Sequence, residues 1–178
     1  MANRLTRIYT RTGDGGETGT ASGARLPKDD LLMQVQGELD ELNCVLGVLA
    51  VRLTGDSLEL VRDVQHALFD IGGEVSLGQA LLVQAKVDAL EQQIDAFNAR
   101  LEPLKEFILP GGNETGAMCH HARAVCRRAE RSMVALNRRT VLNPISLAYI
   151  NRLSDLLFVF SRVLNDKDEI YWKSGKNR

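Results

Sequence analysis

Residues 35–53, VQGELDELNCVLGVLAVRL, carry an apolar side chain at every third or fourth position. This spacing follows the repeat of an α-helix, so the stretch predicts an amphipathic helix with one buried face. Pro27, together with the acidic residues that follow Lys28, indicates the start of this helix, because proline and acids favour the first turn. The apolar positions of the series are Val35, Leu39, Leu42, Leu46, Leu49 and Leu53.

The same spacing recurs in the rest of the chain. Two prolines and a glycine pair interrupt it at residues 103–112, and Asn143-Pro144 interrupts it again, as expected of joints between helices. The second helix should weaken at Gly72-Gly73, because glycine destabilises helices. Further helices are expected from about residue 57, over 87–101, over 114–138 and over 147–164. No segment shows period-two alternation, so we predict an all-α, five-helix bundle forming a single domain, residues 1–178.

The overall composition excludes several classes of protein. Hydrophobic residues make up 44% and charged residues 25% of the 178 residues, which is typical of a folded globular protein. A formal net charge of −1 gives no general attraction to nucleic acid or to an anionic membrane. The sequence contains no apolar run of ~18 residues that would span a membrane, and its start lacks the apolar centre of a signal peptide. Three cysteines without zinc-like spacing suit a reducing compartment, so we expect a cytoplasmic protein.

The segment before the first helix has a different composition. Residues 10–23, TRTGDGGETGTASG, are small, polar and rich in glycine. Backbone N–H groups that converge in such a loop, and its threonine hydroxyls, can bind phosphate oxygens. The lysine spacing of a P-loop is absent, so any nucleotide would bind by another geometry. A flexible tail without a ligand is the alternative interpretation.

The most unusual helix is the fourth. Its residues 123–131, RAVCRRAER, place Arg123, Arg127 and Arg131 four residues apart, so that their side chains share one face. Arg128 flanks this face, and Glu130 is the only acid between residues 120 and 139. A solvated basic surface is the plain interpretation. Stacked guanidinium groups repel one another, however, and a triphosphate would relieve that repulsion by accepting paired hydrogen bonds.

Several other polar residues are candidate ligands. Asp40 adjoins a core position of the first helix, from which it could reach an arginine of a neighbouring helix. Asn151 adjoins a core position of the fifth helix, where a satisfied interior amide and a ligand contact are both open. His120 and His121, beside Cys119, project about 100° apart on a helix and do not suit one metal ion. The Glu-x-x-His pairs of a di-iron bundle are also missing, so we expect no metal bound by the protein.

Six fragments of the chain together resemble one known family. In order they are IYTRTGDGGETGT, RLPKDD, GELDELN, FILPGG, ARAVCRRAER and YINRLSD. The chain resembles the PduO-type ATP:cob(I)alamin adenosyltransferases. The resemblance implies a homotrimer of five-helix bundles that binds ATP, with Mg²⁺, between subunits and a corrinoid beside it. The implied reaction transfers the 5′-deoxyadenosyl group of ATP to the cobalt of cob(I)alamin and releases triphosphate.

The resemblance also implies which residues bind ATP. It makes residues 1–27 a flexible ATP-binding segment and residues 28–168 the helical bundle, and it places Lys28 on the phosphates and Asn151 near the ribose. Arg11 and Gly15 stand where many members have lysine, so one phosphate contact is missing at Gly15. The remaining implied ATP-binding residues are Thr10, Arg11, Thr12, Gly13, Asp14, Thr18, Gly19, Arg127, Arg128, Glu130 and Arg131.

Four residues are expected to serve the chemistry itself. The resemblance pairs Asp40 with Arg123, across the subunit interface, and places Phe107 against the lower face of the corrin. Arg127 belongs to the same group because it faces the departing triphosphate. A flavoprotein reductase and an adenosylcobalamin-dependent enzyme are the implied partners. A regulatory nucleotide-binding bundle without turnover is the main alternative, and a purely structural oligomer is another.

Overall fold

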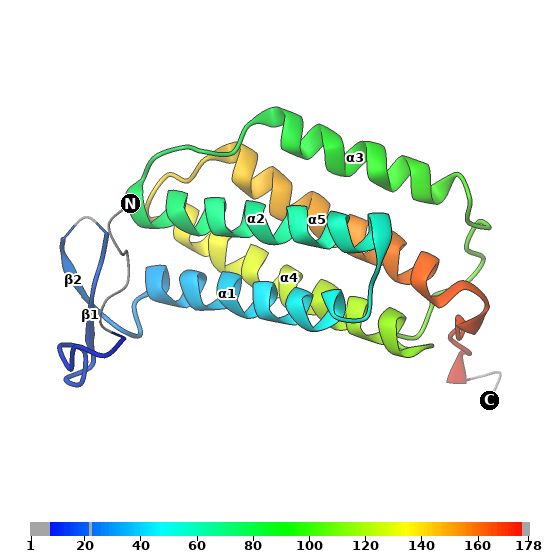
Figure 1. Cartoon of the computed structure of the whole chain (residues 1–178), viewed down its shortest axis with the longest axis horizontal. Coiled ribbons are helices and arrows are strands. Elements are labelled where there is room, and N and C mark those ends of the chain that lie inside the picture. The colour runs from blue at the N-terminus through cyan, green and yellow to red at the C-terminus, as the bar shows by residue number, and fades with distance from the viewer. Residues whose placement is uncertain (1–7, 22, 176–178) are drawn as a thin grey trace.

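The structure is a computed structural model that describes residues 8–21 and 23–175. Residues 1–7, 22 and 176–178, which include parts of the predicted N-terminal segment, lie outside the described residues. Five helices form the bundle, as predicted (Figure 1). They are α1 (Leu31–Ala50), α2 (Gly55–Leu77), α3 (Gln84–Asn98), α4 (Glu114–Asn137) and α5 (Pro144–Asn165), followed by the 3₁₀ helix η1 (Asp166–Asp168).

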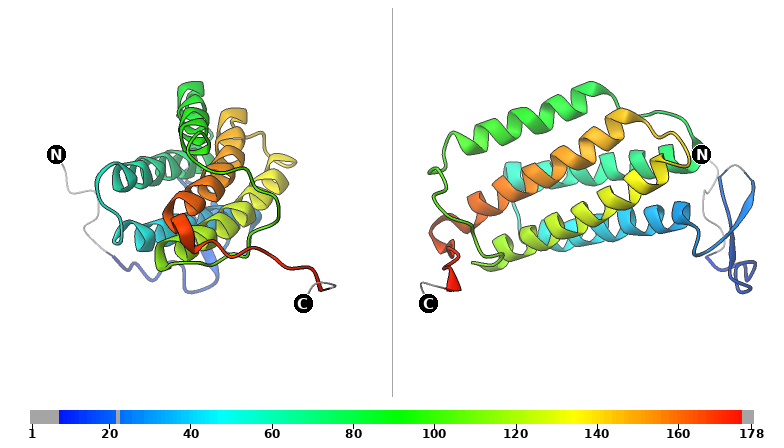
Figure 2. Two further views of the ribbon diagram at one scale, coloured as in Figure 1. Left: turned by 90° about the vertical axis from the view of Figure 1, so that its right-hand side faces the viewer. Right: turned by 180° about the vertical axis from the view of Figure 1, so that it is seen from behind.

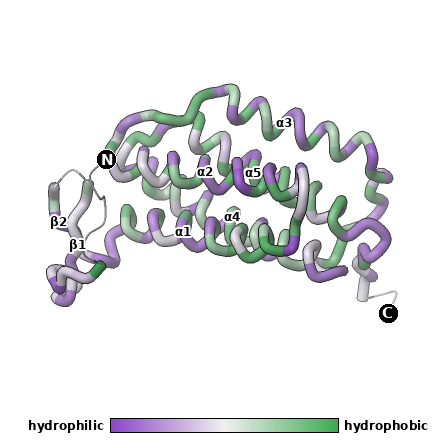
Figure 3. Tube along the Cα trace, in the orientation of Figure 1, coloured by the Kyte–Doolittle hydropathy of each residue, from purple (hydrophilic) through white to green (hydrophobic). Residues whose placement is uncertain are grey.

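The helices pack in a layered order. Helix α4 lies between α1 and α5, while α2 covers α1 and α3 covers α5. Hydrophobic and hydrophilic positions recur along each helix (Figure 3), and the buried positions are mostly apolar. All six apolar residues of the 35–53 series are buried, which confirms the face predicted for α1. Among the described residues, no helix is long and apolar enough to cross a membrane.

Two predicted helix features are wrong. Helix α1 begins at Leu31 rather than near Pro27, because the side chain of Asp30 caps the helix by accepting from the Leu32 amide at 2.8 Å. Helix α2 continues through Gly72-Gly73 without a break. The side chain of Gln36 on α1 donates to the Gly72 carbonyl at 2.8 Å, so the glycines serve as a contact surface between helices.

The Gly-rich head contains a small sheet that the sequence did not indicate. Strands β1 (Glu17–Gly19) and β2 (Arg25–Pro27) pair antiparallel, with Thr18 opposite Leu26. Each strand has three residues, too few for a hydropathy alternation to be recognised. Arg25 ties the sheet to the preceding loop, since its guanidinium donates to the Thr12 carbonyl at 2.8 Å. The head lies at one end of the bundle and the C-terminal segment at the other (Figures 1 and 2).

A buried carboxylate holds the head end of the bundle together. Glu74 of α2 is 6% exposed and accepts hydrogen bonds from the amides of Leu81 and Leu82, the side-chain amide of Asn143 and the hydroxyl of Ser146. Burial alone would raise the pKa of Glu74, but these four donors outweigh burial and lower it. One ionised side chain thereby joins α2, the α2–α3 loop and the start of α5.

Candidate active site

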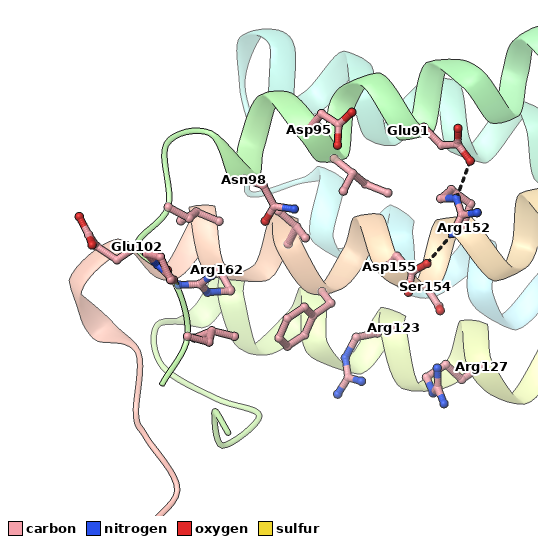
Figure 4. A pocket seen from close by; sticks show the side chains of 16 residues that line it. Glu91, Asp95, Asn98, Glu102, Arg123, Arg127, Arg152, Ser154, Asp155 and Arg162 are labelled. Atoms are coloured by element: carbon pink, nitrogen blue, oxygen red, sulfur yellow. Dashed lines mark hydrogen bonds and ion pairs between the residues drawn. The ribbon is translucent and has the colours of Figure 1, made fainter. Parts of the chain in front are cut away.

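A cavity of about 860 Å³ opens between α3, α4 and α5. Its charged residues come from all three helices (Figure 4), and apolar side chains of α3, the α3–α4 loop and α5 complete the lining. We call this cavity the arginine cleft. It is lined by Glu91, Ile94, Asp95, Asn98, Leu101, Glu102, Pro103, Leu104, Arg123, Arg127, Arg152, Ser154, Asp155, Phe158, Val159 and Arg162.

The predicted arginine face of α4 forms one wall of the arginine cleft. Among the described residues, no carboxylate lies within ion-pair distance of Arg123, Arg127 or Arg131. The Arg123 guanidinium lies 5.9 Å from the centre of the Phe158 ring, and its buried Nε has no hydrogen-bond partner. Burial and the nearby charge of Arg127 lower the pKa of Arg123. This concentration of unneutralised positive charge suits a polyanion.

Not every arginine of the motif faces the cleft. Arg128 turns toward α1, where its guanidinium pairs with Glu41 and approaches Glu38 at 4.0 Å. Glu130 and Asn151 do meet, because the Asn151 amide donates to the Glu130 carboxylate at 2.8 Å. The sequence placed these two residues on different helices, and the structure brings them together beside the arginine face.

A network of ion pairs around Arg152 joins two of the helices that line the arginine cleft. Arg152 of α5 donates to Glu91 of α3 at 2.9 Å and to Asp155 at 2.9 Å (Figure 4). These two carboxylates raise the pKa of Arg152. The network links α3 to α5 beside the arginine cleft. In the sequence, Arg152 and Asp155 interrupt an otherwise apolar segment of the fifth helix, but nothing there indicated their partner Glu91 on α3.

Asp40 and Arg123 lie on different surfaces of the chain. Asp40 is exposed at the edge of a separate hollow between α1 and α2, of about 550 Å³, whereas Arg123 faces the arginine cleft. No ion pair joins them within the described part of the chain. A contact between the two residues therefore requires two subunits.

The head gathers several of the predicted phosphate ligands. A side chain added at Gly13 would lie 3.2 Å from the Lys28 ammonium, so that cation sits directly beside the Gly13 backbone. The hydroxyls of Thr10 and Thr12 are 2.8 Å apart. Arg11 adopts a φ of 61°, which non-glycine residues rarely do, and its guanidinium lies 5.6 Å from the centre of the Tyr9 ring. The hydrogen bonds and the ion pair of Arg25 stay within the head, because its partners are Glu17 and the Thr12 carbonyl.

Phe107 stands outside the helices and is 77% exposed, so it does not cap the bundle core within its own chain. Its ring lies edge-on to Trp172, with centroids 6.4 Å apart and an interplanar angle of 76°. Trp172 belongs to the C-terminal segment, for which the sequence suggested no role. Nothing periodic in the sequence marks this contact, because it joins two short irregular segments 65 residues apart.

Comparison with known proteins agrees with this geometry. The sequence model of a family described as cobalamin adenosyltransferase matches residues 8–164. A cobalamin adenosyltransferase of Cupriavidus metallidurans is 47% identical, over 93% of this chain and 91% of its own. A corrinoid adenosyltransferase of Bacillus subtilis is 39% identical, over 92% of this chain and 89% of its own.

A solved structure is similar over nearly the whole chain. It is a variant PduO-type ATP:corrinoid adenosyltransferase from Lactobacillus reuteri complexed with cobalamin and ATP. The TM-score is 0.89 at 30% identity, and the match covers 94% of this chain and 100% of that chain.

The five-helix bundle and its cationic cleft define an ATP-dependent transferase that acts on corrinoids. The chain belongs to the cobalamin adenosyltransferase family. It transfers the adenosyl group of ATP to the cobalt of a reduced corrinoid, which confirms the reaction and the family predicted from the six sequence fragments.

Proposed function

We propose that this chain performs adenosyl transfer at a site shared by two neighbouring subunits of a homotrimer. The observation that carries this proposal is the separation, within one chain, of groups that must act together. Asp40 and Arg123 line different hollows, and the head lies at one end of the bundle, where none of its described residues lines the arginine cleft. A neighbouring subunit brings its own head and its own Asp40 to the arginine cleft. Sedimentation tests the assembly, and a monomer that is fully active would overturn it.

ATP is held by its triphosphate. Arg127 and Arg131 supply exposed guanidinium groups without carboxylate partners, and Lys28 beside Gly13 supplies a further cation. Each charged hydrogen bond contributes about 1.5–3 kcal/mol to binding. The Asn151–Glu130 pair offers an amide and a carboxylate to the ribose hydroxyls. Arg128 acts indirectly, by fixing α4 against α1 through Glu41.

Magnesium enters with the triphosphate. Among the described residues, no group of three histidine, cysteine or acidic side chains is placed to hold an ion. Mg²⁺ commonly keeps several waters and binds through substrate phosphates with one or two carboxylates, so this residue set fits an ion carried by ATP. When bound, it neutralises charge on the phosphates. The arginines of α4 and Lys28 then position the chain of phosphates.

The corrinoid lies against the apolar residues that line the arginine cleft. Ile94, Leu101, Leu104, Phe158 and Val159 offer a surface for the corrin ring next to Arg123. Co(I) donates its electron pair to the 5′ carbon of ATP and forms the cobalt–carbon bond, while the C5′–O bond breaks and triphosphate leaves with the electron pair of that bond. Cobalt is formally oxidised to Co(III). The protein contributes by aligning the reacting atoms and by stabilising the departing charge with fixed cations.

Phe107 prepares the cobalt. Its exposed ring takes the place of the lower axial ligand, which leaves Co(II) four-coordinate and more easily reduced by one electron from a flavoprotein. A cytoplasmic setting, a flavoprotein reductase and an enzyme that consumes adenosylcobalamin complete the proposed context. Residues 1–27 form the ATP-binding segment, and residues 28–168 form the helical bundle that carries the arginine cleft.

One experiment separates turnover from regulation. The protein is mixed with ATP and chemically reduced cobalamin, and absorbance follows the formation of a cobalt–carbon bond. Catalytic formation of adenosylcobalamin, in excess over enzyme, is expected. Tight ATP binding without any absorbance change would instead favour the regulatory bundle.

A further inference from the structure

The chain does not end at α5 but returns to the Phe107 loop. Residues 169–172, EIYW, which we call the C-terminal strap, pair antiparallel with residues 107–109. The Leu109 amide donates to the Ile170 carbonyl at 2.8 Å, and the Trp172 amide donates to the Phe107 carbonyl at 2.7 Å. These hydrogen bonds give the irregular Phe107 loop a partner of defined register.

A buried ion pair anchors the strap. Arg162 near the end of α5 donates to Glu169 at 2.8 Å, and the two side chains are only 7% and 9% exposed. The same guanidinium donates to the Glu102 carbonyl at 2.9 Å, in the loop that leads from α3 to Phe107. One buried cation therefore joins α5, the C-terminal strap and the α3–α4 loop. Arg162 also lines the arginine cleft, so this junction lies beside the proposed corrinoid site.

The strap also restrains the Phe107 ring itself. The Trp172 ring meets the Phe107 ring edge-on at 6.4 Å, an arrangement that aromatic pairs favour. Phe107 is 77% exposed even with this contact in place. Among the described residues, the Trp172 ring is the one aromatic ring that packs against it. The amide of Phe107 donates at 2.9 Å to the adjacent Glu106 carboxylate, so the strap acts on Phe107 through its carbonyl and its ring.

We propose that Trp172 is a positioning residue for Phe107 and that the Arg162–Glu169 pair holds Trp172 in place. This inference rests on the proposed role of Phe107 and extends it. A ring that must exclude an axial ligand from cobalt has to keep one orientation while the corrinoid enters. The bundle core provides no such restraint, since Phe107 lies outside it. The C-terminal strap provides it through one ring contact and the paired backbone.

The test compares two ways of supplying Co(I) to the full-length enzyme. In one, a reduced flavoprotein must reduce Co(II) on the enzyme; in the other, Co(I) is made beforehand by a strong chemical reductant. Trp172→Ala should lower flavin-dependent turnover by about threefold to tenfold, the range that loss of one edge-on aromatic contact gives. Turnover with preformed Co(I) and the KM for ATP should stay near wild type. The fraction of four-coordinate Co(II), seen by absorption and electron paramagnetic resonance in the presence of ATP, should fall in parallel.

Further variants assign the effect. Glu169→Gln should also lower the ratio of flavin-dependent turnover to turnover with preformed Co(I), because it weakens the ion pair that anchors the strap. Ile170→Ala is the matched control, because it shortens an exposed side chain of the strap while leaving the Trp172–Phe107 ring contact and the Arg162–Glu169 pair in place. Thermal unfolding confirms that each variant is folded. Equal losses with both reductants, or an equal effect of Ile170→Ala, would overturn the positioning role of Trp172.

The reference variant is Phe107→Ala. Should Phe107→Ala leave the ratio unchanged, the proposed role of Phe107 fails. Should Phe107→Ala lower the ratio while Trp172→Ala does not, only the inference about the strap fails.

Discussion

Replacing Arg127 with alanine isolates the contribution of the arginine face to ATP binding. Arg127 is exposed and has no carboxylate partner among the described residues, so its loss should change the free energy of unfolding by less than about 0.5 kcal/mol. Against a bound triphosphate the same side chain makes one or two charged hydrogen bonds. Each is worth about 1.5–3 kcal/mol, so even a single lost bond weakens ATP binding by about tenfold to a hundredfold.

Calorimetric titration with magnesium-ATP measures this loss directly, and steady-state kinetics with preformed Co(I) reports it as a change in KM and kcat. Arg139→Ala is the matched control, because Arg139 is an exposed arginine just beyond α4 that does not line the arginine cleft. The control should bind ATP like the wild type. If Arg127→Ala and Arg139→Ala bind ATP equally well, the arginine face does not bind phosphate and the placement of the triphosphate is wrong.

Three further outcomes are expected. Asp40→Ala should destabilise the trimer in sedimentation by leaving Arg123 unpaired, and a double variant no worse than either single one supports their contact, whereas additive losses speak against it. Magnesium-ATP should protect the chain from proteolysis between Thr10 and Gly23, and identical cleavage with and without the ligand would contradict phosphate binding by the head. The lowered pKa of Glu74 means that its contribution to stability is complete above about pH 4.3 and is lost as the pH falls through the folded-state pKa. Urea unfolding should therefore show a shallower decline at acid pH for Glu74→Gln than for wild type, and equal declines would exclude this linkage.

The sequence predicted the helices well because each buries one continuous face. The apolar series of α1 and the arginine series of α4 both follow the helical repeat, which any window of a dozen residues reveals. The helix start at Leu31 was missed because it depends on a single hydrogen bond, from the Leu32 amide to the Asp30 side chain. The continuity of α2 at Gly72 was missed because it depends on Gln36 of another helix.

The site was predicted less completely for the same physical reason. The positions of Arg123, Arg127 and Arg131 on one face follow from spacing alone, and the structure confirms that Arg123 and Arg127 line one cleft. The direction of Arg128 toward Glu41 depends on how α1 packs on α4. The pairing of Phe107 with Trp172 depends on a chain reversal after α5, and no local pattern records such a contact.

The head lies at one end of the bundle, and none of its described residues lines the arginine cleft of the same chain. In the proposed trimer, each subunit lends its head to one active site and its α4 to another. Two defective subunits can then complement each other. A variant lacking Lys28 keeps a sound cleft, and a variant lacking Arg127 keeps a sound head, so a mixed trimer contains a site assembled from the sound halves of both. Mixing the two variants, each nearly inactive alone, should restore activity that neither homotrimer has.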